Sequence, residues 1–122
     1  MTFLWIVLGG ALGTAARVAI ATPLNQPSGQ GFPVGTLLVN LVGCLAIGYL
    51  SASMAEASGI RHEVKLALIV GCLGGFTTFS SFGLETLSLL QAGHIATAIS
   101  YVLLSNVAGV GLAWLGVRAA AS

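Results

Sequence analysis

The sequence predicts an all-α integral membrane protein of four transmembrane helices in a single domain. Hydrophobic residues make up 57% of the 122 residues and charged residues only 6%, a composition typical of membrane proteins. Hydrocarbon about 30 Å thick is crossed by roughly 20 helical residues, and the chain contains four apolar stretches long enough to do so. The net charge of +1 argues against a nucleic-acid partner, because nucleic-acid binding depends on clustered Lys and Arg.

We expect the helices at about residues 3–22, 34–54, 64–90 and 95–117. The first should end before Pro23, because proline interrupts a helix, and the loop from Pro23 to Pro33 is rich in turn-forming residues. A charged loop over residues 55–63 follows the second helix, and Arg118 should close the fourth at an interface. No basic residue precedes the first apolar run, so we expect that run to be retained rather than cleaved as a signal peptide.

The basic residues specify the membrane orientation only weakly. With the N-terminus in the cytoplasm, Arg61, Lys65 and Arg118 fall on that side and Arg17 falls toward the other, a small excess by the positive-inside rule. The sequence is therefore compatible with insertion in both directions. Because four thin helices enclose little volume, we expect a polar path to form between two subunits rather than within one.

Small residues inside the predicted helices point to close packing. Three stretches have the small-xxx-small spacing that lets helix backbones approach in lipid; they start at Gly9, Gly71 and Ser105. Packing within one four-helix bundle is sufficient to explain them. Cys44 and Cys72 lie in apolar runs without metal-like spacing and are interpreted as two buried thiols.

The third segment contains the stretch that distinguishes this chain. Residues 71–85 hold four glycines, four hydroxyl side chains and three phenylalanines, which weakens a helix because Ser and Thr side chains compete for backbone carbonyl groups. Non-helical backbone at membrane depth is tolerated only inside protein or beside a wet cavity, so we expect the third helix to be broken near mid-membrane. The break is either a packing kink or a place where inward-facing carbonyl groups bind a hard cation such as Na⁺.

Uncharged polar residues form a second pattern. Thr36 and Asn40 share a face of the second helix, and Tyr101 and Ser105 repeat their spacing on the fourth, where Asn106 follows. The Asn40 carboxamide either bonds a neighbouring helix or donates to an anion in a path. Neutral donors suit a small anion, because they replace its water in stages and still release it.

Aromatic and ionisable residues leave further alternatives open. Phe79 and Phe82 either pack together or present their electropositive ring edges to an anion. Ionisable residues inside membranes are functional candidates by default. Arg17 is either a snorkelling anchor or a cation that attracts anions to a vestibule, and Glu85 is either an interfacial or packing carboxylate or a group at the mouth of a path.

Together these motifs resemble one family. Gly9 to Gly13 with Arg17, the sequence GTLLVNLVG at residues 35–43 and GGFTTFSSF at residues 74–82 are similar to the Fluc (CrcB) fluoride ion channels, and the resemblance runs through all four segments. It implies a dual-topology homodimer of antiparallel subunits with two narrow fluoride pathways. It also implies a structural Na⁺ at the dimer centre, held by main-chain carbonyl groups that would fall at Gly74 and Thr77.

The resemblance also assigns the expected fluoride pathway. With Thr36 added from its position on the Asn40 face, the expected lining residues are Asn40, Phe79, Phe82, Ser80, Ser81, Thr36, Tyr101 and Ser105. Arg17 and Glu85 would lie at the vestibule or pore mouth. Two positions depart from the family pattern: Gly109 stands where some members carry a hydroxyl, and Leu45 where many are aromatic.

The expected function is passive fluoride export through a multi-pass protein of the inner (plasma) membrane, conferring fluoride resistance. The chain would be no enzyme and would need no organic cofactor; its partners would be fluoride, lipid and a second copy. The alternative is a small multidrug-type proton-coupled exporter, but such a pump needs a carboxylate inside the first helix, which has none. A non-transporting membrane subunit would explain the glycines and not the polar residues.

Overall fold

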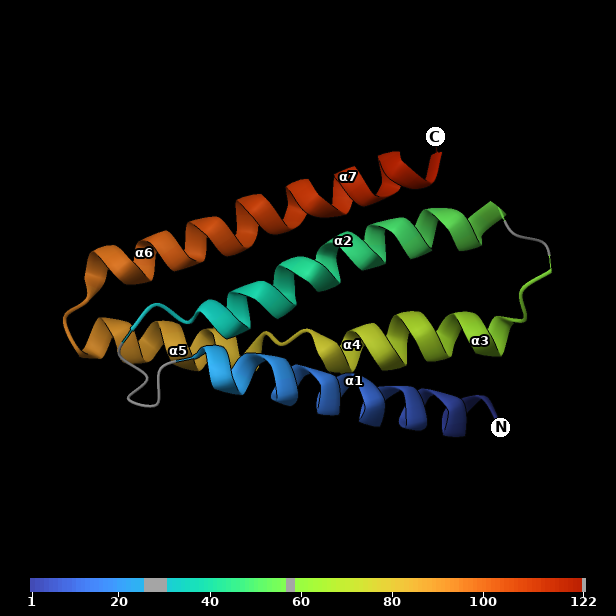
Figure 1. Cartoon of the computed structure of the whole chain (residues 1–122), viewed down its shortest axis with the longest axis horizontal. Coiled ribbons are helices and arrows are strands. Elements are labelled where there is room, and N and C mark those ends of the chain that lie inside the picture. Colours follow the sequence, from blue (N-terminus) through green and yellow to red (C-terminus); the bar gives the residue numbers. More distant parts are fainter. Residues whose placement is uncertain (26–30, 57–58, 122) are drawn as a thin grey trace.

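The computed structural model describes residues 1–25, 31–56 and 59–121. The described residues form four long helical segments that lie side by side, each running antiparallel to the one before it in the chain (Figure 1). Residues 26–30 and 57–58, which fall within the two predicted loops, are outside the described part. The architecture is therefore an all-α bundle.

Two of the segments are continuous α-helices and two change helix type along their length. The elements are α1 (Thr2–Leu24), α2 (Val34–Glu56), α3 (His62–Leu66), the π-helix η1 (Ala67–Leu73), α4 (Gly74–Phe76), α5 (Ser80–Gln91), α6 (Ile95–Leu103), the π-helix η2 (Leu104–Ala108) and α7 (Gly109–Ala121). The third segment thus comprises α3, η1, α4 and α5, and the fourth comprises α6, η2 and α7.

The observed helix ends differ slightly from the predicted ones. Helix α1 continues through Pro23 to Leu24, because the N–H group of Asn25 still reaches the Ala21 carbonyl at 2.9 Å and only proline's own ladder bond is lost. Helix α3 begins at His62 with Glu63 in its first turn, where the helix dipole favours a carboxylate. Arg118 lies in the last turn of α7 over the Trp114 ring.

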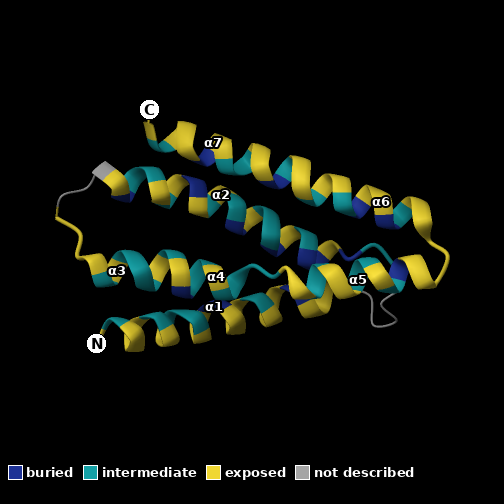
Figure 2. Ribbon diagram, turned by 180° about the vertical axis from the view of Figure 1, so that it is seen from behind, coloured by how far each residue is buried: buried dark blue, intermediate teal, exposed yellow. Residues whose placement is uncertain are grey.

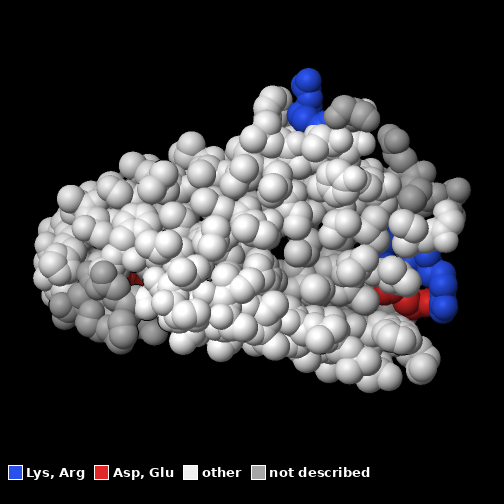
Figure 3. All heavy atoms as spheres, in the orientation of Figure 1, with Lys and Arg blue, Asp and Glu red and all other residues white. Residues whose placement is uncertain are grey.

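Four helical segments in the described part are long and apolar enough to cross a membrane. Many large apolar residues along them are exposed, and Figure 2 shows exposed positions on all four segments. The face seen in Figure 3 is almost entirely uncharged, and its Lys and Arg atoms lie toward the end of the bundle that carries both termini. This surface suits lipid or another apolar protein surface.

Close backbone contacts join the segments in pairs. A Cβ atom added at Gly13 would lie 2.0 Å from the Cys72 carbonyl oxygen, and one at Gly75 would lie 2.5 Å from that of Gly10. The small residues near Gly9 and Gly71 therefore pack α1 against the third segment within one chain. Helices α2 and α7 meet in the same way, since a Cβ at Gly48 would lie 2.0 Å from the Ala113 oxygen.

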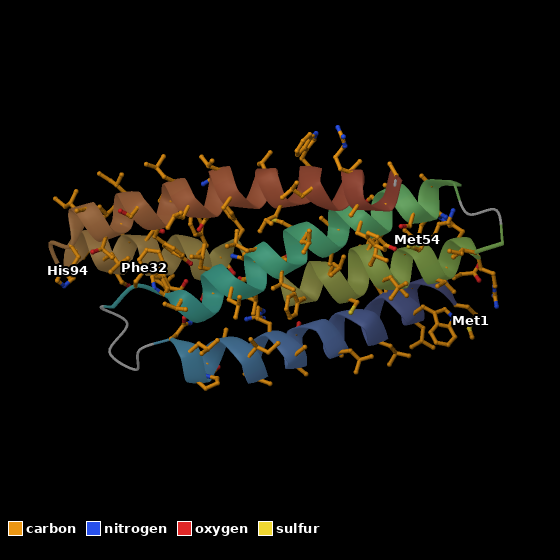
Figure 4. The ribbon with its side chains drawn as sticks, turned by 45° about the horizontal axis from the view of Figure 1, so that its top comes forward. Met1, Phe32, Met54 and His94 are labelled. Carbon is orange, nitrogen blue, oxygen red and sulfur yellow. The ribbon has the colours of Figure 1, made fainter. Side chains whose placement is uncertain are left out.

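The two ends of the bundle are distinct. Met1 and Met54 lie at one end and Phe32 and His94 at the other (Figure 4). Among the described residues few side chains are fully buried, and Leu89, Ala98 and Tyr101 form a cluster near the second end. Cys44 and Cys72 are unbonded thiols that are half-buried, less enclosed than predicted.

Candidate functional site

The third segment is interrupted at residues 77–79. Helix α4 ends at Phe76, Thr77 has an extended backbone (φ −86°, ψ 160°) and α5 begins at Ser80, so the ribbon between α4 and α5 is uncoiled in Figure 1. The Thr77 hydroxyl donates to the Leu73 carbonyl at 3.0 Å, the backbone-directed bond expected of a threonine at a helix end. The interruption thus lies within the Gly-, Thr- and Phe-rich stretch.

Asn40 of α2 binds both the backbone N–H group and the backbone carbonyl group of one residue in the interruption, Thr78. Its Oδ1 accepts from the Thr78 N–H at 2.8 Å and its Nδ2 donates to the Thr78 carbonyl at 3.1 Å. A carboxamide nitrogen carries two hydrogens, and within the described residues this nitrogen donates one hydrogen bond, which leaves the second hydrogen available. The two interpretations of Asn40, as an inter-helix hydrogen bond and as a donor to an anion, are therefore compatible.

A groove of about 350 Å³ opens beside the interruption, between α2, the third segment and η2. Six predicted site residues line it together: Asn40, Gly74, Thr77, Phe79, Phe82 and Ser105. The groove is also lined by apolar side chains such as Ile47, Ile69 and Leu73. It combines a few polar groups with apolar walls, the usual make-up of a small-ligand site.

The two phenylalanines at the groove differ in how far their rings are exposed and packed. Phe79 is 83% exposed and its ring centroid lies 5.8 Å from that of Phe82, with the planes tilted by 42°. The Phe82 ring in turn contacts the buried Tyr101 ring, with centroids 5.0 Å apart. Phe82 is thus fixed by packing, while Phe79 offers most of its ring to whatever fills the space beside it.

Two carbonyl groups at the interruption lose their helical donors. In a continuous helix the carbonyls of Gly74 and Thr77 would accept from the N–H groups of Thr78 and Ser81. The Thr78 N–H donates to Asn40 instead, and the Ser81 N–H donates to the Thr78 hydroxyl at 3.2 Å. Such carbonyl groups are suitable ligands for a hard cation, and they belong to the two residues predicted as metal ligands.

Arg17 has a role that neither of its two interpretations anticipated. It is half-buried, and its Nε donates to the Gly75 carbonyl at 3.2 Å. Gly75 lies in the last turn of α4, where carbonyl groups lack intrahelical partners. Arg17 therefore supplies a donor to a carbonyl group at one end of the interruption. This bond holds its guanidinium group beside the interruption.

Glu85 lies in a separate polar cluster near the end of the bundle. Its Oε2 accepts from the Thr36 hydroxyl at 2.7 Å and from Asn25 Nδ2 at 3.4 Å, and its Oε1 accepts from the Tyr101 hydroxyl at 2.8 Å. The structure thus places three predicted residues in one cluster outside the groove. Asn25 was not predicted; the only sequence signal is a polar amide directly after a helix end.

The three predicted serines differ in their position relative to the groove. Ser80 and Ser81 lie in the first turn of α5 and are not among the groove-lining residues. Within the described part, Ser105 is the residue whose buried side-chain oxygen has no hydrogen-bond partner. Asn106, by contrast, donates to the carbonyl of Val102 in its own helix at 2.8 Å.

Comparison with known proteins gives consistent matches over nearly the whole chain. The family described as CrcB-like protein, Camphor Resistance (CrcB), matches residues 4–117. The fluoride-specific ion channel FluC of Paracoccus denitrificans is 51% identical over 106 residues, which cover 87% of this chain and 83% of that protein. The channel of the same name from Stutzerimonas stutzeri is 44% identical over 115 residues, covering 94% and 93%, and that from Aquifex aeolicus is 40% identical over 111 residues, covering 91% and 90%.

Proposed function

Because the chain belongs to the CrcB family, we propose that it is a fluoride-selective channel that lets F⁻ leave the cytoplasm passively. The chain is a multi-pass protein of the inner membrane, and as a member of an ion-channel family it is not an enzyme. Hydrogen fluoride enters cells as a neutral acid and dissociates in a less acidic cytoplasm. A path for the trapped anion lets the membrane potential expel it.

The observation that carries the proposal is the set of unused donors around the groove. Within the described part, Asn40 keeps one amide hydrogen and the buried Ser105 hydroxyl has no hydrogen-bond partner. Leaving a buried polar group unsatisfied costs about 1–3 kcal/mol, and an anion passing between these groups would satisfy both. The groove therefore supplies what a small, strongly hydrated anion needs in place of water.

The phenylalanines support selectivity for such an anion. Phe79 and Phe82 line the same groove as Asn40, and a phenyl ring presents a partly positive edge. Rings and neutral amides bind an anion less tightly than a fixed cation would, so that the ion can leave again. In this proposal Phe79, Phe82, Asn40 and Ser105 contact the ion in the narrow part of the path.

The other predicted residues lie on either side of this narrow part. Thr36, Tyr101 and Glu85 form the cluster near one end of the bundle, and Ser80 and Ser81 lie just beyond the interruption. The proposal assigns these five, together with Arg17, to the approach from that end. Arg17 attracts anions while its Nε stays bound to the backbone.

The proposal includes an antiparallel homodimer with two pathways and one Na⁺ at its centre. The exposed Phe79 ring and the open side of the groove support a partner subunit that completes each path. The Gly74 and Thr77 carbonyl groups, which have lost their helical donors, fit a sodium site of main-chain oxygens contributed by both subunits. Na⁺ would supply positive charge that holds the two interruptions together.

The direct test measures ion release from liposomes. Purified protein is reconstituted into liposomes loaded with potassium fluoride or potassium chloride, and valinomycin starts electrically balanced efflux. We expect rapid release of F⁻ and retention of Cl⁻, with protein-free liposomes as the control. Equal release of the two halides would refute selectivity, and release of neither would refute the channel.

A further inference from the structure

We infer that Asn25, at the end of α1, is a positioning residue for the anion path: its carboxamide fixes the Glu85 carboxylate and the Thr36 hydroxyl relative to each other. This inference rests on the proposed function and adds a residue to it. Asn25 is the C-cap of α1 and has an extended backbone (φ −80°, ψ 147°), which turns its side chain toward the start of α2.

The oxygen of the Asn25 side chain caps α2 from outside that helix. Oδ1 accepts from the N–H of Gly35 at 2.8 Å and from the N–H of Thr36 at 3.2 Å. The first N–H groups of a helix have no intrahelical partner, so this oxygen replaces a local N-cap. One half of the carboxamide is therefore committed to holding α1 against α2.

The nitrogen of the same carboxamide joins this helix start to α5. Nδ2 donates to the Thr36 hydroxyl at 3.0 Å and to Glu85 Oε2 at 3.4 Å, while the Thr36 hydroxyl donates to the same carboxylate oxygen at 2.7 Å. Asn25, Thr36 and Glu85 thus form a closed triangle of hydrogen bonds. Replacing the Asn25 side-chain nitrogen with an oxygen would leave Glu85 Oε2 facing an acceptor instead of a donor.

The triangle is connected to the groove by direct contacts. Glu85 Oε1 accepts from the Tyr101 hydroxyl at 2.8 Å, and the Tyr101 ring packs on Phe82, which lines the groove. A displaced Glu85 would therefore disturb Tyr101 and then Phe82. Through these contacts Asn25 acts on the path without touching the ion.

The substitution Asn25→Asp tests the donor half of the carboxamide independently of the acceptor half. Aspartate keeps an oxygen for the Gly35 and Thr36 N–H groups and replaces the donor that faces Glu85 with a second carboxylate oxygen. In liposomes buffered at pH 8 we expect fluoride efflux to fall at least tenfold. In the Asn25→Asp/Glu85→Gln double variant the repulsion is gone, so efflux should return to within twofold of the Glu85→Gln level.

Asn25→Ala is the matched control for capping, because it removes the acceptor as well as the donors. Its loss of efflux should persist in the Glu85→Gln background. Efflux of Asn25→Asp at the wild-type rate, or an unchanged defect in the double variant, would overturn the positioning role while leaving the proposed channel intact. If Asn25→Asp alone fails to fold, a folded and conducting double variant supports the inference and a misfolded one overturns it. A wild-type protein that releases no fluoride refutes the proposed function instead.

Discussion

A single methyl group added at Gly43 should disturb the interruption in the third segment. Its Cβ would lie 2.1 Å from Cγ2 of Thr77, well inside van der Waals contact, so Thr77 must move by more than an ångström. Forcing extra carbon into a packed site typically costs about 1–3 kcal/mol. We therefore expect Gly43→Ala to lower the free energy of unfolding by that amount and to reduce fluoride efflux.

A second substitution tests whether the collision itself is responsible. Thr77→Ser removes Cγ2 and keeps the hydroxyl that donates to Leu73, at a cost of about 0.8 kcal/mol for the lost methyl group. The double variant Gly43→Ala/Thr77→Ser should therefore be more stable than Gly43→Ala alone. Gly111→Ala is the matched control, because a Cβ there would meet nothing within 4 Å.

The assay combines stability with transport. Thermal unfolding of the purified protein in detergent is followed by tryptophan fluorescence and size-exclusion chromatography, and efflux is measured in liposomes. Gly43→Ala should unfold at a lower temperature than Gly111→Ala. Equal unfolding temperatures and efflux rates for these two variants, or no recovery on adding Thr77→Ser, would show that the collision with Thr77 is not responsible.

The remaining predictions concern the ion path. Asn40→Asp keeps the acceptor for the Thr78 N–H but loses the donor to the Thr78 carbonyl, so we expect a less stable protein in which the proposed dimer still forms. It also puts a carboxylate beside the proposed fluoride path. Two unit charges 4 Å apart repel by about 4 kcal/mol at an effective dielectric of 20, so efflux should fall roughly a thousandfold, and wild-type efflux would remove Asn40 from the path. Phe79→Ile and Phe82→Ile keep apolar bulk and lose the polarised ring edge, so each should lower efflux at least tenfold while the protein still folds and forms the proposed dimer. Unchanged efflux in both variants would favour a packing role for the two rings. Protein purified without Na⁺ should conduct poorly and recover when Na⁺ is added back, whereas full efflux without Na⁺ would contradict the proposed sodium site.

Helix number could be predicted because it follows from how many apolar stretches are long enough to cross a membrane. Apolar stretches of membrane-spanning length identify the four segments, and the glycine, threonine and serine content of residues 71–85 marks where helical bonding competes with side-chain bonding. The end of α1 was placed too early because the propensity rule treats Pro23 as a stop. In the structure proline costs one ladder bond and the helix continues.

The partners of individual polar groups could not be predicted, since they depend on how the helices pack. The spacing of Thr36 and Asn40 placed both on one face of α2. It could not indicate that Thr36 bonds Glu85 while Asn40 bonds the Thr78 backbone. Arg17 likewise required the position of α4 before its bond to the Gly75 carbonyl could be seen. Asn25 was missed because nothing in its neighbouring sequence distinguishes it from a turn residue.

The paired hydrogen bonds between Asn40 and Thr78 have a consequence for how the chain tolerates a non-helical residue in an apolar surrounding. One carboxamide offers the peptide unit of Thr78 the same donor and acceptor that a neighbouring β-strand would offer, so the bundle contains the equivalent of a single rung of sheet. Side chains of the same shape without both functions, such as leucine or aspartate, cannot form that rung.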